Sequence, residues 1–525
     1  MELKKSCLDA FEASGTMTLT QEETAETIVP DYCPDIARIV RTDGRVYLHS
    51  RELRDGRAEV GGTVRISVLY TPDGEKGLRT VEFAMPFTAS SERGSFPKCS
   101  HLTAEVEVAS LETRMLNPRK VFTRCKLVSR LTGYQKTQML FGTDIEAEEK
   151  LCVEKRQIRQ NVVFLPAIHE KDFSFTDDIL LSPGRDGAAE ILSSTIRSVV
   201  SDTKAVGNKL IFKGSFYVSL LYRDNGGKYA SFDAELPFSQ VMEAEDGAEE
   251  TTAEFRLQLT GADLQIGGDD PDGRQISTAL YLHATAFLYR EQEITLLEDL
   301  YSTAYNTTYD AAPLELTSFR EAMTRRQTVR EILEIGVVAE SILSLSAVCG
   351  SVNIGREGQN TVLRSNVIIR ALYLDEGGAA LFAERTVEVS CYLELPEGCR
   401  ITAEALCCEE IQGSIGDRGI EGRFPVDFSM RAEGKTRRVC ISNLRLDTEV
   451  PKDIAAAPSL VLRWLHPQES AWDLAKKYHT TIAAILAANG LEAEEDIPCE
   501  KLLLIPKKRA KRNWTAFAVQ FLNVA

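Results

Sequence analysis

The clearest pattern along the chain is an aliphatic segment that occurs three times. Its copies read VRISVLY at Val64–Tyr70, FYVSLLY at Phe216–Tyr222 and VIIRALY at Val367–Tyr373. Because these runs are rich in β-branched and aliphatic residues, each predicts a buried β-strand. A short segment with Asp and Gly follows every copy, and Gly tolerates the positive φ of a tight turn. Each copy is therefore expected to be one arm of a β-hairpin.

The spacing of the copies predicts the domain organisation. Tyr70, Tyr222 and Tyr373 close the three runs and are 152 and 151 residues apart. Repeats of this length are much longer than those of solenoids and have the size of ordinary domains. We therefore expect a mainly β chain. Its three tandem β-rich domains are predicted at residues 1–157, 158–309 and 310–455.

A second recurring segment precedes each predicted strand. It reads ARIV at 37–40, AEIL at 189–192 and REIL at 330–333, and it predicts a short amphipathic helix. Its isoleucine precedes the closing tyrosine by 31 residues in the first two copies and by 41 residues in the third. The third copy therefore diverges most from the other two.

Residues 456–507 show a different pattern, in which two apolar runs enclose two predicted helices. The runs at 459–465 and 501–505 predict short strands. Ser470 and Asp473 form a capping box ahead of the first helix, because the serine oxygen can accept a hydrogen bond from a free backbone N–H group. The expected unit is a small domain with the order strand–helix–helix–strand.

The second helix of this unit is predicted from its own end signals. Thr480 is expected to be its N-cap, and the Asn-Gly pair at 489–490 is expected to end it. The apolar stripe of this helix runs from Ile482 to Leu486, so Leu486 is expected to be buried.

The tail at residues 508–525 combines a cluster of cations, which begins at Lys507, with an apolar helical face that follows it. The positive side chains are Lys507, Lys508, Arg509, Lys511 and Arg512, and the apolar ones include Trp514, Phe517 and Phe521. A basic segment beside an apolar helical face suits an anionic membrane surface. The alternative is a solvated linker with a short helix docked on the protein itself or on a partner.

Charge and targeting signals limit the function classes. The chain has 525 residues with 61 basic and 78 acidic side chains, a net charge of −17, which disfavours nucleic-acid binding. It has no run of about 18 apolar residues, so no membrane-spanning helix is expected. The first residues lack the apolar core and cleavage site of a signal peptide, so we expect a cytoplasmic protein.

No catalytic or metal-binding pattern recurs in the three copies. The twelve cysteines are expected to be free thiols, and the cluster at 391, 399, 407 and 408 lacks the paired spacing of zinc sites. The histidines are scattered, among them those at positions 49, 101, 169 and 283. A site kept by duplication would repeat its acid, base or nucleophile at equivalent positions. We therefore expect a protein that is not an enzyme and has no metal or cofactor.

The repeats resemble a known domain family. Pro34-Asp35-Ile36 precedes the first strand, Gly62 lies eight residues before its tyrosine, and a Pro-Phe pair at 86–87 follows the hairpin. These features resemble the SPOCS domain of spore-coat and sporulation proteins of endospore-forming Firmicutes. The first copy matches best and the third least. The resemblance implies three SPOCS-like domains.

The C-terminal unit resembles the LysM domain. The similarity rests on WDLAKKY at 472–478, Thr-Thr at 480–481, Asn-Gly-Leu at 489–491 and Leu-Ile-Pro at 504–506. LysM domains usually bind N-acetylglucosamine glycans such as peptidoglycan. The resemblance implies a binding groove formed by Glu469, Ser470, Ala471, Trp472, Asn489, Gly490, Leu491, Ile497 and Pro498. Gln468-Glu469 stands where the family usually has Gly-Asp, and the side chain added in place of glycine favours a protein ligand over glycan.

The combination of SPOCS-like and LysM domains is similar to a family of clostridial spore-coat morphogenetic proteins. Members bind a coat morphogenetic ATPase, stage IV sporulation protein A, through the LysM domain. The resemblance implies a scaffold without enzymatic activity in the mother-cell cytoplasm, at the forespore surface. The alternative function is that of a peptidoglycan-binding protein of the spore or cell wall.

Overall fold

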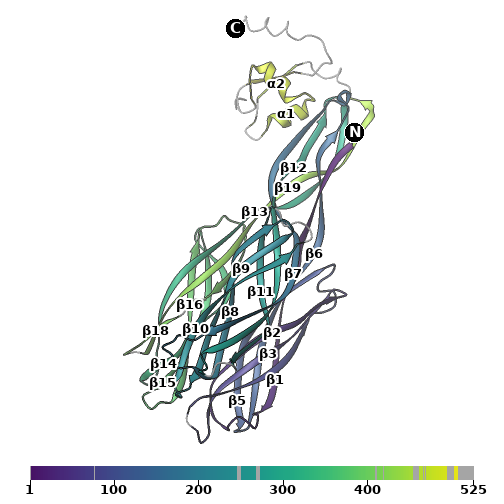
Figure 1. Cartoon of the computed structure of the whole chain (residues 1–525). Coiled ribbons are helices and arrows are strands. Elements are labelled where there is room, and N and C mark those ends of the chain that lie inside the picture. The colour runs from purple at the N-terminus through teal and green to yellow at the C-terminus, as the bar shows by residue number, and fades with distance from the viewer. Residues whose placement is uncertain are drawn as a thin grey trace.

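The computed structural model describes residues 2–75, 77–244, 250–267, 272–407, 411–417, 419–452, 460–464, 466, 469–493 and 502–506. In these ranges the chain is mainly β, and the α-helices lie near its C-terminal end (Figure 1). The predicted mainly β class is therefore confirmed.

Three consecutive parts of the chain, called units 1, 2 and 3, have the same arrangement of antiparallel strands. Unit 1 contains β1 (Glu2–Ile28), β2 (Ile36–Arg54), β3 (Arg57–Pro72), β4 (Arg79–Ser90), β5 (His101–Asn117) and β6 (Lys120–Glu146). After a 3₁₀ turn at Glu149–Leu151, unit 2 contains β7 (Val153–Leu180), β8 (Ala188–Val206), β9 (Lys209–Asp224), β10 (Tyr229–Glu243), β11 (Thr251–Ile266) and β12 (Gln275–Ser302). Unit 3 contains β13 (Tyr305–Leu333), β14 (Ala339–Glu357), β15 (Asn360–Asp375), β16 (Ala380–Leu393), β17 (Arg400–Leu406), β18 (Gln412–Gly416) and β19 (Gly419–Pro451).

Each unit forms two sheets. In unit 1 the sheet orders are β2-β3-β4 and β1-β6-β5, in unit 2 they are β8-β9-β10 and β7-β12-β11, and in unit 3 they are β14-β15-β16 and β13-β19-β17, with β18 also paired to β19. Tyr70, Tyr222 and Tyr373 lie on the middle strands β3, β9 and β15 and are buried. The repeat inferred from the tyrosine spacing is therefore a repeat of structure.

The short helix predicted before each of these strands is wrong. Residues 37–40 lie in β2, residues 189–192 in β8 and residues 330–333 in β13. Ile39 and Ile191 pair with Tyr70 and Tyr222, and the ladder shifts register on both sides of each isoleucine. Such β-bulges break the strict alternation of a strand, and four residues are too few to separate the two periods.

The predicted alignment of the third copy is also wrong. The residue that pairs with Tyr373 is Ile342 on β14, again with register shifts on both sides. Ile342 precedes its tyrosine by 31 residues, as in the other two units, whereas Ile332 lies in β13. The third unit thus keeps the spacing of the first two, although its sequence diverges here.

Equivalent residues of the three units meet on one axis. Leu69, Leu221 and Leu372, each of which precedes a closing tyrosine, belong to one buried cluster. Beside this cluster, Arg41 of unit 1 donates hydrogen bonds to Ser193 at 2.8 Å and to Ser344 at 3.5 Å, the residues at its own position in units 2 and 3. The units are therefore arranged with approximate threefold symmetry inside a single chain.

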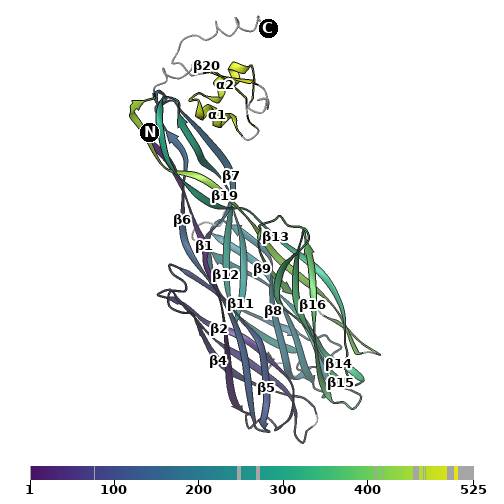
Figure 2. The same ribbon diagram turned by 180° about the vertical axis from the view of Figure 1, so that it is seen from behind.

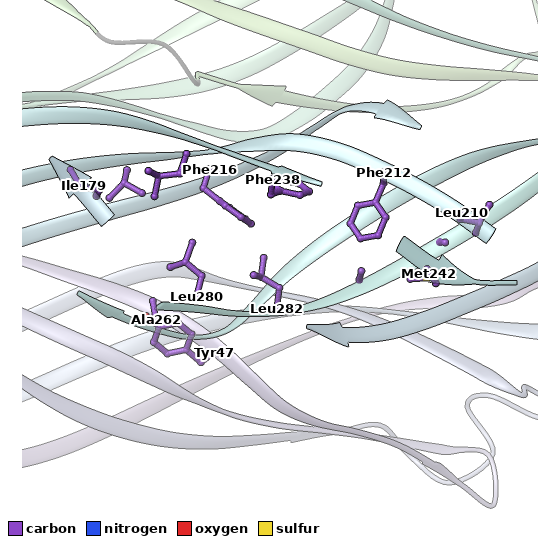
Figure 3. Packing of buried hydrophobic residues seen from close by; sticks show 14 of the residues in the cluster. Tyr47, Ile179, Leu210, Phe212, Phe216, Phe238, Met242, Ala262, Leu280 and Leu282 are labelled. Atoms are coloured by element: carbon purple, nitrogen blue, oxygen red, sulfur yellow. The ribbon is translucent and has the colours of Figure 1, made fainter. Parts of the chain in front are cut away.

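The core of unit 2 shows how each pair of sheets packs. Phe212 and Phe216 of β9 and Phe238 of β10 face Leu280 and Leu282 of β12 (Figure 3). The rings of Phe216 and Phe238 stack with centroids 4.6 Å apart. The cluster also contains a tyrosine from β2 of unit 1, at position 47, so neighbouring units share apolar contacts.

The longest strands continue beyond the paired sheets as a narrower body, called the stalk here (Figures 1 and 2). It consists of the outer parts of β1, β6, β7, β12, β13 and β19. Its buried side chains come from all three units and include Leu8, Phe141, Val162, Leu296, Leu316 and Cys440. The predicted boundaries at 157/158 and 309/310 fall within β7 and β13 near the far end of the stalk. Whether each unit folds as a separate domain stays a prediction.

Candidate functional site

The C-terminal unit has the predicted order of strands and helices. It contains β20 (Leu460–Trp464), α1 (Ala471–Lys477), α2 (Ile482–Asn489) and β21 (Leu502–Pro506), and the two strands form an antiparallel pair. Its buried core includes Leu474, Ala475, Ile485, Leu503 and Ile505.

Local sequence signals position the two helices. The capping box is present, since Ser470 accepts a hydrogen bond from the backbone of Asp473 and Asp473 accepts one from the backbone of Ser470. The N-cap of α2 is Thr481 rather than the predicted Thr480. Ile485 is fully buried, whereas Leu486 is only half-buried. The prediction that Leu486 is buried is therefore wrong.

The α1 face of the C-terminal unit packs against the far end of the stalk. The ring of Trp472 meets that of Tyr301 on β12 edge to face, with centroids 5.0 Å apart. The indole Nε1 donates a hydrogen bond of 2.8 Å to Oδ2 of Asp299 on the same strand. Trp472 is 6% exposed, so its side chain faces the stalk and not the solvent.

A buried carboxylate is the centre of this contact. Lys476 of α1 donates to both oxygens of Asp299 at 2.7 and 2.9 Å, and Tyr309 of β13 donates to Oδ1 at 2.7 Å. Burial alone would raise the pKa of the Asp299 carboxyl, but the hydrogen bonds that it accepts outweigh burial and hold this pKa below its ordinary value. Burial likewise favours the neutral form of Lys476, yet its bonds to Asp299 and Tyr309 raise its pKa. Both groups are therefore charged, and each stabilises the other.

A second set of contacts fixes the unit on its other side. The buried hydroxyl of Tyr301 donates a 2.9 Å hydrogen bond to the carbonyl oxygen of Thr480. Lys452 donates to the carbonyl oxygen of Ser302 at 2.9 Å, and its Nζ lies 3.1 Å from Nδ1 of His479. Burial and the nearby Lys452 lower the pKa of His479. The unit is thus held on the stalk by apolar and polar contacts together, and we call this region the stalk junction.

Most of the predicted groove residues have structural roles. Ser470 caps α1, and Ala471 and Trp472 are buried. Glu469 forms a 2.6 Å ion pair with Arg463 of β20, so its carboxylate is engaged within the unit.

The residues of the other predicted loop are also used internally. The amide of Asn489 bonds to both backbone groups of Leu504 on β21, at 2.7 and 2.9 Å. Gly490 ends α2 with a φ of 66°, a conformation that glycine adopts without strain. Leu491 is half-buried, and its N–H donates to the carbonyl of Leu486. Ile497 and Pro498 lie outside the described residues, so the groove as a whole stays a prediction.

The tail predicted to contact a membrane also lies outside the residues that the structure describes. This applies to Lys507, Lys508, Arg509, Lys511, Arg512, Trp514, Phe517 and Phe521. Within the described ranges, no helix has the length and apolar character needed to cross a membrane. Over the same ranges, no group of three or more His, Cys, Asp or Glu residues is arranged to hold a metal ion.

Sequence reasoning missed the partners of Trp472 on the stalk. Asp299, Tyr301 and Tyr309 lie more than 160 residues from α1 in the chain, and no local pattern links the two segments. The available signal is weak: Asp299 follows Glu298 in LLEDLY at 296–301, a strand end whose other side chains are mostly apolar. A carboxylate in such a position is stable only with a partner.

Three histidines that are scattered in the sequence line one cavity between units 1 and 2. His49, His101 and His283 contribute to this polar space of about 440 Å³. Nδ1 of His283 lies 2.6 Å from Oδ1 of Asp172, and its Nε2 lies 3.7 Å from Oε1 of Glu170. The interaction with this histidine is the main cause that lowers the pKa of the Glu170 carboxyl. The cavity belongs to the joint between the units, where charged groups pair with one another.

Two segments of the chain match a known family. Residues 35–116 and 188–266 match the family described as SipL, SPOCS domain, and they correspond to β2–β5 of unit 1 and β8–β11 of unit 2. The comparisons with curated proteins and with solved structures found no match. The resemblance to LysM therefore stays a prediction. The SPOCS resemblance is confirmed: this chain is a SipL-like protein that carries the SPOCS domain in its first two units.

Proposed function

We propose that this protein is a non-enzymatic scaffold of sporulation. In this proposal it links spore-coat assembly to the forespore surface, in the mother-cell cytoplasm. It does so by binding a coat morphogenetic ATPase of the stage IV sporulation protein A type through its C-terminal unit. The SPOCS match supports the connection to sporulation. The strand–helix–helix–strand order of the C-terminal unit supports its interpretation as a LysM domain.

The choice of a protein as the ligand rests on one observation: the predicted groove residues already make contacts within the protein. Trp472 is buried against the stalk, Asn489 is bonded to β21, and Glu469 is paired with Arg463. Glycan binding depends on groups that can bond or stack with sugar rings, and these three side chains are already engaged. The arrangement therefore favours a protein ligand over peptidoglycan.

The position of the unit also suits a scaffold. It is mounted at the far end of the stalk, away from the paired sheets of units 1–3 (Figures 1 and 2). Because α1 faces the stalk, the remaining faces of the unit point outward. A binding module held in a fixed orientation loses less freedom when it binds, which favours affinity.

Binding measurements on the full chain test the proposal. The full chain should bind the purified ATPase with saturation and should not sediment with insoluble peptidoglycan. A chain that ends at Lys452 should lose the ATPase and keep the melting behaviour of units 1–3. Saturable peptidoglycan binding by the full chain would contradict the choice of ligand. ATPase binding by the shortened chain would place the binding site in the SPOCS-like units instead.

A further inference from the structure

The C-terminal unit has one strongly apolar exposed surface. Leu460, Leu462 and Trp464 of β20 and Leu502 of β21 are 46%, 58%, 57% and 47% exposed, respectively. Across the strand pair, Leu462 lies opposite Leu504 and Trp464 opposite Leu502, and directly opposed residues point to the same side of a sheet. These side chains therefore form one continuous patch, called the outer sheet face here.

The strands have the composition of a sheet that is covered on both sides. The inner face packs on the helices, because Leu503 and Ile505 are buried in the same cluster as residues of α1 and α2. A sheet with one solvated face alternates apolar and polar residues, whereas strands covered on both sides are continuously apolar. β21 reads LLLIP and β20 reads LVLRW, in which the one polar residue, Arg463, lies opposite the buried Leu503 on the inner face and pairs with Glu469. The outer sheet face is thus built to be covered.

Within the part of the chain that the structure describes, the stalk does not supply this cover. Its contacts with the C-terminal unit involve Trp472 and Lys476 of α1 and the turn at Thr480. These residues belong to the helical layer, on the opposite side of the strand pair. The cover must therefore come from another segment or molecule.

The chain itself provides a matching segment immediately after β21. β21 ends at Pro506, which lies opposite Leu460 at one end of the patch. Trp514, Phe517, Phe521 and Leu522 follow at the spacing of one helical face. The seven residues 507–513 can span up to about 23 Å when extended, and a five-residue strand is only about 17 Å long. The connection is therefore long enough to bring this segment back across the patch.

We propose that residues 514–522 form a helix that packs on the outer sheet face and closes the C-terminal unit into three layers. The apolar side chains of the segment cover those of β20 and β21, and the basic residues 507–512 form the solvated connection. The short connection makes this contact intramolecular, which favours it over the same contact between separate molecules. The inference is independent of the ligand of the C-terminal unit. It assigns the apolar face of the tail to the protein itself rather than to a membrane.

Tryptophan emission in the full chain tests this contact. The chain has three tryptophans, so a Trp464→Phe background leaves the buried Trp472 and Trp514 as emitters. Leu462→Asp then places a charge in the outer sheet face without changing the core, because Leu462 is 58% exposed. The matched control is Leu140→Asp on β6, where the leucine is 63% exposed and lies outside the C-terminal unit. Difference spectra against the Trp514→Phe version of each variant isolate the emission of Trp514.

The expected result is shielded, short-wavelength emission from Trp514, a shift to longer wavelength in Leu462→Asp, and no shift in the control. If Trp514 emits as a solvent-exposed residue in every variant and becomes shielded only when phosphatidylglycerol vesicles are added, the proposal is overturned in favour of a membrane contact. Shielded emission that Leu462→Asp leaves unchanged would show that the segment docks elsewhere. Shielding that disappears on dilution, together with a dimer in sedimentation velocity, would identify a second copy of the chain as the occupant.

Discussion

The joints between units 1–3 differ in kind from the joint between the stalk and the C-terminal unit. On the axis of units 1–3, leucines from equivalent positions of all three units are buried together. Polar contacts occur there too, such as the ion pairs of Glu254 with Arg320 and Arg431 between units 2 and 3. The stalk junction instead has one buried carboxylate at its centre, Asp299, which accepts hydrogen bonds from three side chains. The joint between the repeated units is distributed over equivalent residues of all three units. The stalk junction has no such repeats, so we expect that a single substitution can release it.

The largest expected effect is on the axis. Leu221→Ala removes a side chain that is 3% exposed and packs among leucines of the other two units. Large-to-small changes at such sites cost about 2–5 kcal/mol, so the thermal unfolding temperature of the full chain should fall clearly. Val206→Ala on β8, where the valine is 59% exposed, is the control and should melt like the parent. Equal melting of the two variants would show that the axis is not a cooperative joint.

Ile485→Ala should unfold the C-terminal unit and leave units 1–3 intact. Ile485 is fully buried, and the cavity is expected to cost about 2–5 kcal/mol in a unit too small to tolerate it. Proteolysis that removes the C-terminal unit, followed by mass spectrometry, measures this loss. Leu486→Ala is the matched control on the same helix and should be milder, because Leu486 is only half-buried. The opposite ranking would show that α2 presents a different face to the core.

Asp299→Asn should release the C-terminal unit without unfolding it. The change removes the negative charge that stabilises Lys476 and replaces one of the two acceptor oxygens by an amide group. We expect it to weaken the docking of the C-terminal unit by about 1–3 kcal/mol. Emission from Trp472, with Trp464 and Trp514 replaced by Phe, should shift to longer wavelength. Glu293→Gln on the same strand, where the side chain is 57% exposed, should leave the emission unchanged. A shielded Trp472 in Asp299→Asn would contradict a junction centred on this carboxylate.

The stability of the stalk junction should fall at acid pH and at strongly alkaline pH. The lowered pKa of Asp299 gives a contribution that is present above the ordinary carboxyl pKa of about 4 and lost as pH falls through the lowered pKa. The raised pKa of Lys476 gives a contribution that is present below about 10.4 and lost as pH rises through the raised pKa. The lowered pKa of His479 adds a smaller loss that begins below about 6.5.

Trp472 emission in the single-tryptophan chain measures this profile. It should be constant from about pH 7 to pH 10 and should shift to longer wavelength outside that range. His479→Gln should remove the first step on the acid side and leave the loss due to Asp299. A transition centred between pH 7 and pH 10 would contradict the assignment of these groups.

The same comparison explains what the sequence could predict. The buried strands that end in Tyr70, Tyr222 and Tyr373 were found because alternation and turn residues are local and occur three times. The strand segment around Ile39 has the sequence pattern of a short helix, because its bulges remove the alternation that identifies a strand. Its equivalent Ile342 was missed for the same reason.

The candidate site was predictable only where local signals determine it. The capping box at Ser470 and the helix end at Gly490 depend on neighbouring residues, and both are present. The contact between Trp472 and Asp299 joins residues 173 positions apart. The pattern of residues along the chain predicts that Trp472 is buried. It does not show which surface of the protein buries it. The stalk that provides this surface exists only after three units have come together.

Hydrogen exchange of the full chain and of Asp299→Asn tests the contrast between the two kinds of joint most directly. We predict faster exchange in Asp299→Asn at residues 299–309 and 471–482, which form the stalk junction. Exchange at 64–70, 216–222 and 367–373, on the middle strands of the three units, should stay as slow as in the parent chain. Faster exchange on these middle strands would contradict the claim that the axis is distributed over many residues. Unchanged exchange at the stalk junction would contradict the claim that Asp299 is the centre of that junction.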